Sequence, residues 1–177
     1  YNKLQIRITG GNMKTKFDVK ITEKDLFQFN MEQAYKGSQG ILSILFFILL
    51  CAAAVMGFMR GQIFYSVLYI IVGIIVMVYV PLSLKGRVKT VIKTNKVFSE
   101  PLHFEIDEKV IKVSQGEETA ELPWNQVYKV TGNKKRILIF SNRRNAYILP
   151  EEQLGEEFSK VKEIATEVVE KYRLKIK

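Results

Sequence analysis

Two long apolar runs dominate the hydrophobic pattern of the chain. They occupy residues 41–59 and 63–84, and between Lys36 and Lys85 the only charged side chain is that of Arg60. A helix that crosses a bilayer needs about 20 apolar residues, because each residue advances the helix by about 1.5 Å and the hydrocarbon layer is about 30 Å thick. The pattern therefore predicts a transmembrane hairpin of two helices with a short turn at Arg60.

Before the hairpin, the hydrophobic pattern has a different period. Apolar and charged residues alternate over residues 16–21, which is typical of a strand, and Thr22 is a suitable N-cap for a helix over residues 23–35. Residues 1–12 also alternate. We interpret them either as a further strand or as an extension upstream of a natural start at Met13.

After the hairpin, alternation with period two returns and predicts a meander of about five antiparallel strands. Residues 136–140 are apolar on both faces, as expected of a central strand, and Trp124 begins a local turn. The extended segments of this meander are residues 102–107, 110–114, 119–124, 128–131, 136–140 and 146–149.

The C-terminal segment returns to helical spacing. Apolar residues recur every three or four positions from Phe158 to Tyr172, which predicts one amphipathic helix that covers the sheet, with basic residues at its C-terminal end. The fold class that follows is an α+β membrane protein, in which a two-helix hairpin is joined to a small antiparallel meander or partial barrel capped by a C-terminal helix. The predicted divisions are an extension or strand at 1–12, a cytoplasmic strand and helix at 13–36, the hairpin at 37–84, a basic juxtamembrane linker at 85–100 and a cytoplasmic domain at 101–177.

Charge indicates the orientation of the hairpin. The formal net charge is +9, and residues 85–96, directly after the second apolar run, contain basic side chains and no acidic ones. Basic residues beside a spanning helix mark the cytoplasmic side and can contact anionic headgroups, whereas Arg60 belongs at the opposite interface. We therefore expect a multi-pass protein of the plasma membrane with both termini cytoplasmic, and membrane lipids rather than nucleic acid as partners. The candidate contacts to anionic lipid are Lys85, Arg87, Lys89, Lys93 and Lys96; specific recognition of phosphoinositide or phosphatidylserine and a generic stop-transfer collar are the two interpretations of this set.

Small residues recur within the hairpin and define a candidate helix-packing face. They either pack the hairpin on itself or form a homo-oligomer or a contact with another protein. The residues of this face are Ala53, Gly57, Gly61, Ser66 and Gly73. The single cysteine, Cys51, cannot form an internal disulfide and is interpreted as a packing thiol. The apolar runs hold no ionisable Asp, Glu, Lys or His, which argues against a transporter.

Residues with catalytic or metal-binding chemistry are sparse. The only histidine, His103, lies on the polar side of its strand, and no paired Cys or His, nucleophile motif or phosphate-binding glycine loop is present. We therefore expect no enzyme activity, no cofactor and no metal. Basic residues occupy two predicted strand tips at opposite ends of one strand, so the two tips are not expected to form one phosphate pocket. These residues are Lys134, Lys135, Arg136, Arg143 and Arg144.

Three stretches carry a resemblance to a known family. They are KFDVKITEKDLFQFN at residues 16–30, LPWNQVYKV at 122–130 and AYILPEEQL at 146–154. These stretches resemble the YcxB-like family of bacterial two-helix membrane proteins. The resemblance as a whole extends from about Lys14 through the rest of the chain. The resemblance implies a pleckstrin-homology-like cytoplasmic domain, in which one C-terminal helix closes a curved sheet, and it implies no catalytic residues. A complete sheet of that type needs more strands than the meander supplies, so residues 16–21 are expected to join it.

The expected function follows from this arrangement. We expect a non-catalytic integral membrane protein that presents a binding or regulatory domain at the inner leaflet. The alternative is an accessory subunit of a larger membrane complex, assembled through the transmembrane helices.

Overall fold

The computed structural model describes residues 13–176, and these residues form two compact units. One unit, here called the sheet domain, combines residues 13–20 with residues 100–176. The other, here called the helical unit, is Ile21–Ser99. The extension or strand expected at residues 1–12 lies outside the described residues.

The first sheet of the sheet domain is antiparallel and has the order β1-β2-β3-β4. Its strands are β1 (Lys14–Val19), β2 (Leu102–Asp107), β3 (Val110–Gln115) and β4 (Glu118–Pro123). Phe17 of β1 pairs with Phe104 of β2, and the two rings stack with centroids 5.4 Å apart. The prediction that the N-terminal strand joins the later strands is therefore confirmed.

The second sheet has the order β7-β6-β5-β8. A short helix, η2 (Trp124–Gln126), leads into it, and its strands are β5 (Lys129–Asn133), β6 (Arg136–Phe140), β7 (Ala146–Pro150) and β8 (Leu174–Ile176). As predicted, β6 is a central strand, and all its side chains from Ile137 to Phe140 are buried. Strand β8 runs parallel to β5 and had no signal in the hydrophobic pattern.

The structure corrects the sequence prediction at two points. The described residues form eight strands, where about five were expected after the hairpin and one before it. The C-terminal helix is also shorter than predicted. It corresponds to α5 (Glu157–Val168), which follows the separate short helix α4 (Glu151–Leu154), so Tyr172 lies outside it. The chain leaves the helix at Val169 because its last residues pair with β5, where the Val130 amide donates to the Arg173 carbonyl at 2.9 Å.

Helix α5 supplies a large part of the core of the sheet domain. Its buried face consists of Phe158, Val161, Ile164 and Ala165, and it contacts β1 and β8. Phe104 of β2 and Tyr147 of β7 meet edge to face at 5.6 Å, which connects the two sheets. Trp124 is buried, and its Nε1 donates to the Asp107 carbonyl at 2.7 Å. The amphipathic helix α5 therefore covers the sheets as predicted, although it contains fewer residues than expected.

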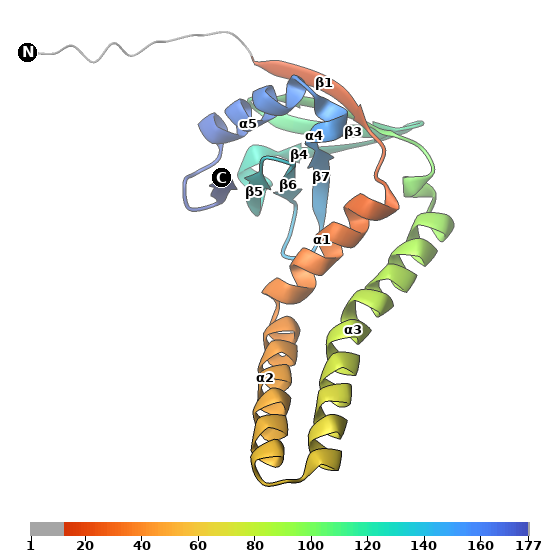
Figure 1. Cartoon of the computed structure of the whole chain (residues 1–177). Helices are drawn as coiled ribbons and strands as arrows, with labels where there is room; N and C mark the ends of the chain where they lie inside the picture. Colours follow the sequence, from red (N-terminus) through yellow and green to blue (C-terminus); the bar gives the residue numbers. More distant parts are fainter. Residues whose placement is uncertain (1–12, 177) are drawn as a thin grey trace, which may run out of the picture. The chain divides into compact units, whose positions relative to one another are not determined.

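The helical unit consists of α1 (Glu23–Lys36), α2 (Ser38–Met59), α3 (Ile63–Thr94) and the short η1 (Lys96–Phe98) (Figure 1). Thr22 and Asp25 form a capping box at the start of α1, which confirms the predicted N-cap. Helices α2 and α3 are both long and apolar enough to cross a membrane. The basic linker expected at residues 85–100 is mostly a continuation of α3.

Glycine and serine allow α2 and α3 to approach each other closely. A Cβ atom at Gly57 would lie 2.3 Å from Ser66 Oγ, and one at Gly73 would lie 3.2 Å from the Phe47 ring. Three predicted members of the small-residue face thus pack the hairpin on itself. Gly61 does not belong to this face: it lies in the turn with φ of 73°, a conformation that favours glycine. Ala53 is half-buried.

The helical unit is inserted between two neighbouring strands of the sheet domain. The chain leaves after β1 and returns at β2, and Val19 and Leu102 are paired at that end of the sheet. Gln153 of α4 holds the exit point through two hydrogen bonds: the Lys20 amide donates to its Oε1 at 2.8 Å, and its Nε2 donates to the Lys20 carbonyl at 3.0 Å. The sheet domain therefore fixes both ends of the insertion.

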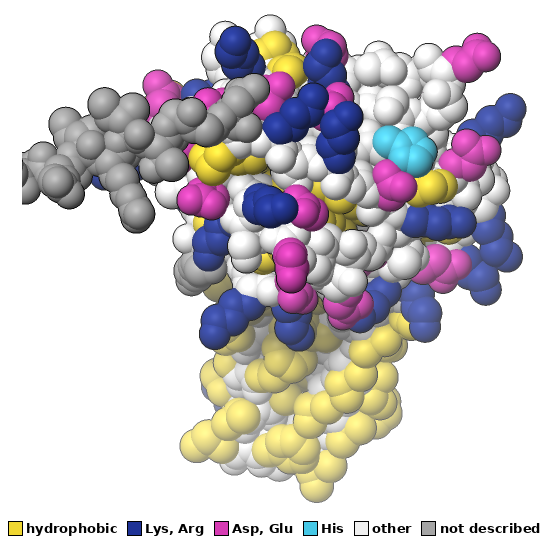
Figure 2. All heavy atoms as spheres, turned by 90° about the horizontal axis from the view of Figure 1, so that it is seen from above, with side chains coloured by type: hydrophobic (Ala, Val, Ile, Leu, Met, Phe, Trp, Pro, Cys, Tyr) yellow, Lys and Arg dark blue, Asp and Glu magenta, His cyan; other side chains and the backbone are white. Residues whose placement is uncertain are grey.

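The two units expose different kinds of side chain. Figure 2 shows hydrophobic side chains covering the hairpin, whereas Lys, Arg, Asp and Glu side chains are spread over the sheet domain. Leu49 of α2 is 66% exposed and Phe64 of α3 is 75% exposed. A soluble protein rarely exposes so many large apolar residues in one continuous surface.

Candidate functional site

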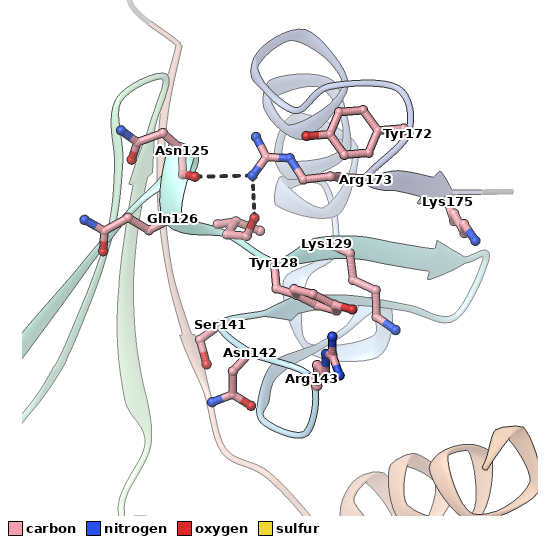
Figure 3. A pocket seen from close by; sticks show the side chains of 11 residues that line it. Asn125, Gln126, Tyr128, Lys129, Ser141, Asn142, Arg143, Tyr172, Arg173 and Lys175 are labelled. Atoms are coloured by element: carbon pink, nitrogen blue, oxygen red, sulfur yellow. Dashed lines mark hydrogen bonds between the residues drawn. The ribbon is translucent and has the colours of Figure 1, made fainter. Parts of the chain in front are cut away.

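A pocket of about 750 Å³ lies on the sheet domain, and three chain segments contribute to it (Figure 3). One segment runs from η2 into β5, the second is the tip between β6 and β7, and the third leads from α5 into β8. The parallel pairing of β8 with β5 brings the third segment beside the first. The lining residues are Asn125, Gln126, Val127, Tyr128, Lys129, Ser141, Asn142, Arg143, Tyr172, Arg173 and Lys175.

The charged residues of the lining are all basic. They are Lys129, Arg143, Arg173 and Lys175, and no Asp or Glu is among the lining residues. Lys129 Nζ lies 4.4 Å from the centroid of the Phe140 ring, a cation–π contact that holds the ammonium group in place. In the part of the chain that the structure describes, Lys129, Arg143 and Lys175 form no ion pair with a carboxylate.

Arg173 has a structural role in the pocket wall. Its Nη1 donates to the Val127 carbonyl at 2.7 Å and to the Asn125 carbonyl at 3.3 Å, and its Nη2 pairs with Glu170 at 3.1 Å. These bonds, two of which are drawn in Figure 3, fasten the segment between η2 and β5 to the C-terminal segment. The Nε atom of Arg173 is buried and has no hydrogen-bond partner among the described residues.

The tip between β6 and β7 presents Arg143 through a tight turn. Asn142 Oδ1 accepts hydrogen bonds from the Arg144 and Asn145 amides, both at 2.8 Å, and the Ser141 amide donates to the Asn145 carbonyl at 3.1 Å. An Asn side chain that accepts from backbone amides two or three residues ahead defines an Asx turn. Arg143 therefore extends from a fixed backbone while its own side chain is exposed.

The other basic tip is built in the same way but lines no part of this pocket. Asn133 Oδ1 accepts from the Lys135 and Arg136 amides at 2.8 Å and 3.2 Å. Lys134 and Lys135 are exposed at the end of β6 opposite to Arg143. The placement agrees with the expectation that the two tips do not combine. Of the five predicted tip residues, only Arg143 belongs to the pocket lining.

The sequence prediction missed Lys129, Arg173 and Lys175 as members of this pocket. The sequence pattern places Arg173 and Lys175 at the end of an amphipathic helix, and it therefore does not indicate that they approach β5. Their chain segment instead forms β8, and Thr131 of β5 pairs with Lys175. A local signal existed only in the excess of basic residues near the C-terminus, and this signal could not identify the partner strand.

The candidate lipid-contact residues lie on the helical unit and are exposed. Lys85, Arg87, Lys89 and Lys93 belong to α3, and Lys96 belongs to η1. Lys85, Lys89 and Lys93 follow one another at four-residue spacing, which places them along one stripe of the helix. Their contact with lipid stays a prediction.

His103 is exposed, as expected from its position on the polar side of β2. Its Nδ1 lies 2.5 Å from Asp18 Oδ1, and the two residues are paired across β1 and β2. Among the described residues, no group of three or more His, Cys, Asp or Glu side chains is placed to hold a metal ion. Cys51 is exposed on α2 rather than packed within the hairpin, which corrects its interpretation as a packing thiol.

Shifted pKa values in the sheet domain have local causes. Hydrogen bonds from Lys14 and Lys16 lower the pKa of Glu105 to about 2, and burial raises the pKa of Tyr147. In the pocket lining, a hydrogen bond with the neighbouring Glu170 carboxylate raises the pKa of Tyr172. The pocket thus combines hydrogen-bond donors with positive charge, an environment suited to binding an anion.

Comparison with known proteins supports the family resemblance for the central part of the sheet domain. The fold defines an α+β protein in which two long apolar helices interrupt a domain of two sheets. A family model described as YcxB-like protein matches residues 106–165, about a third of the chain. This match confirms the resemblance to the YcxB-like family over the segment from β2 to α5. No curated protein and no solved structure matches the chain.

Proposed function

We propose that this protein is a non-catalytic integral membrane protein that presents a pleckstrin-homology-like binding domain at the cytoplasmic face of the plasma membrane. The observation that carries this proposal is the insertion of two long apolar helices between β1 and β2 of one sheet. In water, helices with so much exposed apolar surface would be unfavourable, whereas a membrane-anchored domain requires apolar helices of this length.

The insertion also supports the orientation. The chain leaves and re-enters the sheet domain at paired residues, Val19 and Leu102, so both flanks of the hairpin start on the domain's side of the membrane. A hairpin of two spanning helices meets this requirement because the second helix returns the chain to the side from which the first departed. The exposed basic residues after Leu84 favour the cytoplasm as that side.

The lining of the pocket supports binding rather than catalysis. It offers ammonium, guanidinium, amide and phenol groups, which donate hydrogen bonds, and no His, Cys, Asp or Glu. Its one aliphatic hydroxyl, on Ser141, donates to the Asn145 carbonyl at 3.4 Å and so helps to close the tip. A nucleophile needs an adjacent base to become reactive, and the lining residues supply none.

The assignment as an accessory subunit is less well supported. That alternative used the small-residue face for assembly with other proteins. Gly57, Ser66 and Gly73 are buried within the hairpin, so contacts between α2 and α3 already cover this face.

Labelling of single cysteines tests the proposed orientation. The background variant is Cys51→Ser, which contains no cysteine, and the two reporters are Gln62→Cys in the exposed turn and Lys134→Cys at the exposed tip of the sheet domain. With a membrane-impermeant maleimide applied to intact protoplasts, we expect labelling at residue 62 only. After lysis, residue 134 should be labelled as well.

Two results would contradict the proposal. Labelling of residue 134 in intact protoplasts would place the sheet domain outside the cell. Protection of residue 62 in intact protoplasts, with labelling after lysis, would show that the hairpin does not cross the membrane. Extraction of the protein by alkaline carbonate would likewise contradict an integral anchor.

A further inference from the structure

We propose that the pocket between η2, the β6–β7 tip and β8 binds a phosphate monoester group. This inference deepens the proposed function by naming the ligand class of its binding domain. The binding of a soluble ligand by the pocket does not depend on which side of the membrane the sheet domain occupies. Only a lipid source for the phosphate rests on the proposed orientation.

The charges of the pocket favour an anion. Lys129, Arg143 and Lys175 all line it without a carboxylate partner among the described residues, and no lining residue is acidic. Like charges that share one concave surface repel each other, and a multiply charged anion between them replaces repulsion with attraction. Some basic groups elsewhere on the sheet domain are instead paired with carboxylates, as in the contacts of Lys112 with Glu121 at 2.8 Å and Lys160 with Glu157 at 2.7 Å.

Part of the donor arrangement is fixed before any ligand arrives, namely the Lys129 ammonium group and the backbone of the β6–β7 tip. Lys129 is restrained over the Phe140 ring, and Arg143 extends from the Asx turn that Asn142 closes. In Figure 3, the Tyr128 hydroxyl, the Lys129 ammonium group and the Arg143 guanidinium group end in the same part of the pocket. Restrained donors lose little entropy on binding, which increases affinity.

A phosphate monoester fits these donors better than a singly charged anion. Close to neutral pH it carries between about 1.5 and 2 negative charges and three acceptor oxygens. Arg143 can bind two of these oxygens side by side, while Lys129 supplies a point charge. Lys175 and the Tyr128 hydroxyl are further donors on the same lining.

The size of the pocket indicates that the phosphate belongs to a larger molecule. A volume of about 750 Å³ lies within the range of ordinary small-molecule sites, about 300–1,000 Å³, and far exceeds a phosphate group. Asn125 and Gln126 are exposed members of the lining, and in Figure 3 their side-chain amides point away from Lys129 and Arg143. The phosphate-bearing molecule is either a lipid headgroup or a soluble phosphate ester, and both share the chemistry that the pocket recognises.

Binding assays on the full chain test the inference. With the protein reconstituted in nanodiscs of phosphatidylcholine, titration calorimetry with glycerol 3-phosphate measures the soluble form, and glycerol is the uncharged control probe. Nanodiscs that also contain phosphatidic acid measure the lipid form, by the amount of this lipid that native mass spectrometry finds retained. We expect saturable binding of at least one of the two phosphate probes and none of glycerol.

Matched variants identify the pocket as the site. Lys129→Ala and Arg143→Ala should each weaken phosphate binding by roughly tenfold or more, the effect typical of losing a hydrogen bond to a charged group. Arg144→Ala is the control, because Arg144 occupies the same tip, is exposed and does not line the pocket. Its affinity should equal that of the wild type. Fluorescence of Trp124, the only tryptophan, checks that each variant remains folded.

The possible outcomes distinguish a soluble phosphate ester from a lipid headgroup. They also distinguish failure of the pocket proposal from failure of the proposed membrane orientation. Binding of glycerol 3-phosphate alone would identify a soluble ester, and retention of phosphatidic acid alone would identify a lipid headgroup. No saturable binding of either probe, or an equal loss in Arg144→Ala and Arg143→Ala, would overturn the inference. A wrong membrane orientation would instead appear in the cysteine labelling and would leave the soluble titration unchanged.

Discussion

The helical unit and the sheet domain use apolar residues in opposite ways. In the sheet domain, large side chains such as Ile111 and Ile164 are fully buried, with 0% exposure. In the helical unit, Ile75 is 60% exposed and Leu49 is 66% exposed, while the residues buried in the hairpin between residues 41 and 84 are small. Apolar residues therefore stabilise the sheet domain because they are buried away from water. On the helical unit the same residue types are exposed and are compatible with an apolar solvent.

This difference shows where the stability of each unit originates. Burial of apolar area in water stabilises the sheet domain. In a bilayer, the lipid tails are as apolar as leucine, so close packing of helix backbones takes over this role. Substitutions that remove volume should therefore affect the sheet domain, and substitutions that add volume should affect the hairpin.

The largest expected effect comes from removing volume in the core of the sheet domain. Ile164→Ala should lower the free energy of unfolding by about 2–5 kcal/mol, because it leaves a cavity beneath α5. The matched change in the hairpin, Ile75→Ala, should alter it by less than about 0.5 kcal/mol. The measurement is denaturant unfolding of the full chain in detergent micelles, in which the fluorescence of Trp124 follows the sheet domain and the helical circular dichroism signal follows the hairpin. Equal shifts for both variants would contradict the comparison.

A smaller effect is expected from adding volume between the helices. Gly57→Ala should destabilise the hairpin by about 1–3 kcal/mol, because its Cβ would lie 2.3 Å from Ser66 Oγ. Gly86→Ala is the control within α3: its Cβ would meet no atom within 4 Å, and it should be neutral or stabilising by up to about 1 kcal/mol. Thermal loss of the helical circular dichroism signal in micelles measures both. The second change Ser66→Gly should restore much of the stability of Gly57→Ala, and a lack of rescue would refute this contact.

The smallest effect concerns surface charge on the sheet domain. Glu105 Oε1 lies 2.6 Å from Lys14 Nζ and 2.5 Å from Lys16 Nζ, and these bonds lower its pKa from 4.5 to about 2. A carboxyl group with a lowered pKa in the folded state stabilises the fold above its unfolded pKa. This contribution should be lost as the pH falls from about 4.5 to about 2.

The comparison of wild type with Glu105→Gln isolates this effect from other carboxyl groups. Wild type should have the higher melting temperature above pH 5, and the difference should shrink as the pH decreases, when the Trp124 transition is followed. Because the pair is solvent-exposed, high salt should reduce the difference. A difference independent of pH would show that charge is not its cause.

Local patterns predicted the helical unit well. The first apolar run ends at Met59 and the second begins at Ile63, and the structure has the same two boundaries. The capping box at Thr22 and the central position of β6 were also predicted correctly. These features depend on residues close together in the chain, so a periodicity or a cap is sufficient to identify them.

The candidate pocket could not be predicted in the same way. Lys129 and Lys175 approach each other only because β8 pairs with β5, and the sequence pattern in that segment favoured a helix. The two basic tips look alike in the sequence, with Asn133 and Asn142 in equivalent turns, yet only the second contributes residues to the pocket lining. Which tip becomes part of a site depends on strand order, which no local signal records.

The sequence by itself determined the two spanning-length helices, their turn, the short strands and the basic surface beside the hairpin. Those properties follow from local composition and periodicity, because a long apolar run favours a spanning helix whatever the tertiary contacts of the rest of the chain. Only the tertiary structure decided that β1 joins β2 across the whole inserted unit, that the C-terminus forms β8, and that four basic residues share one pocket. Hydrogen bonds between distant strands select these partners, and their energy depends on the completed sheets rather than on neighbouring residues.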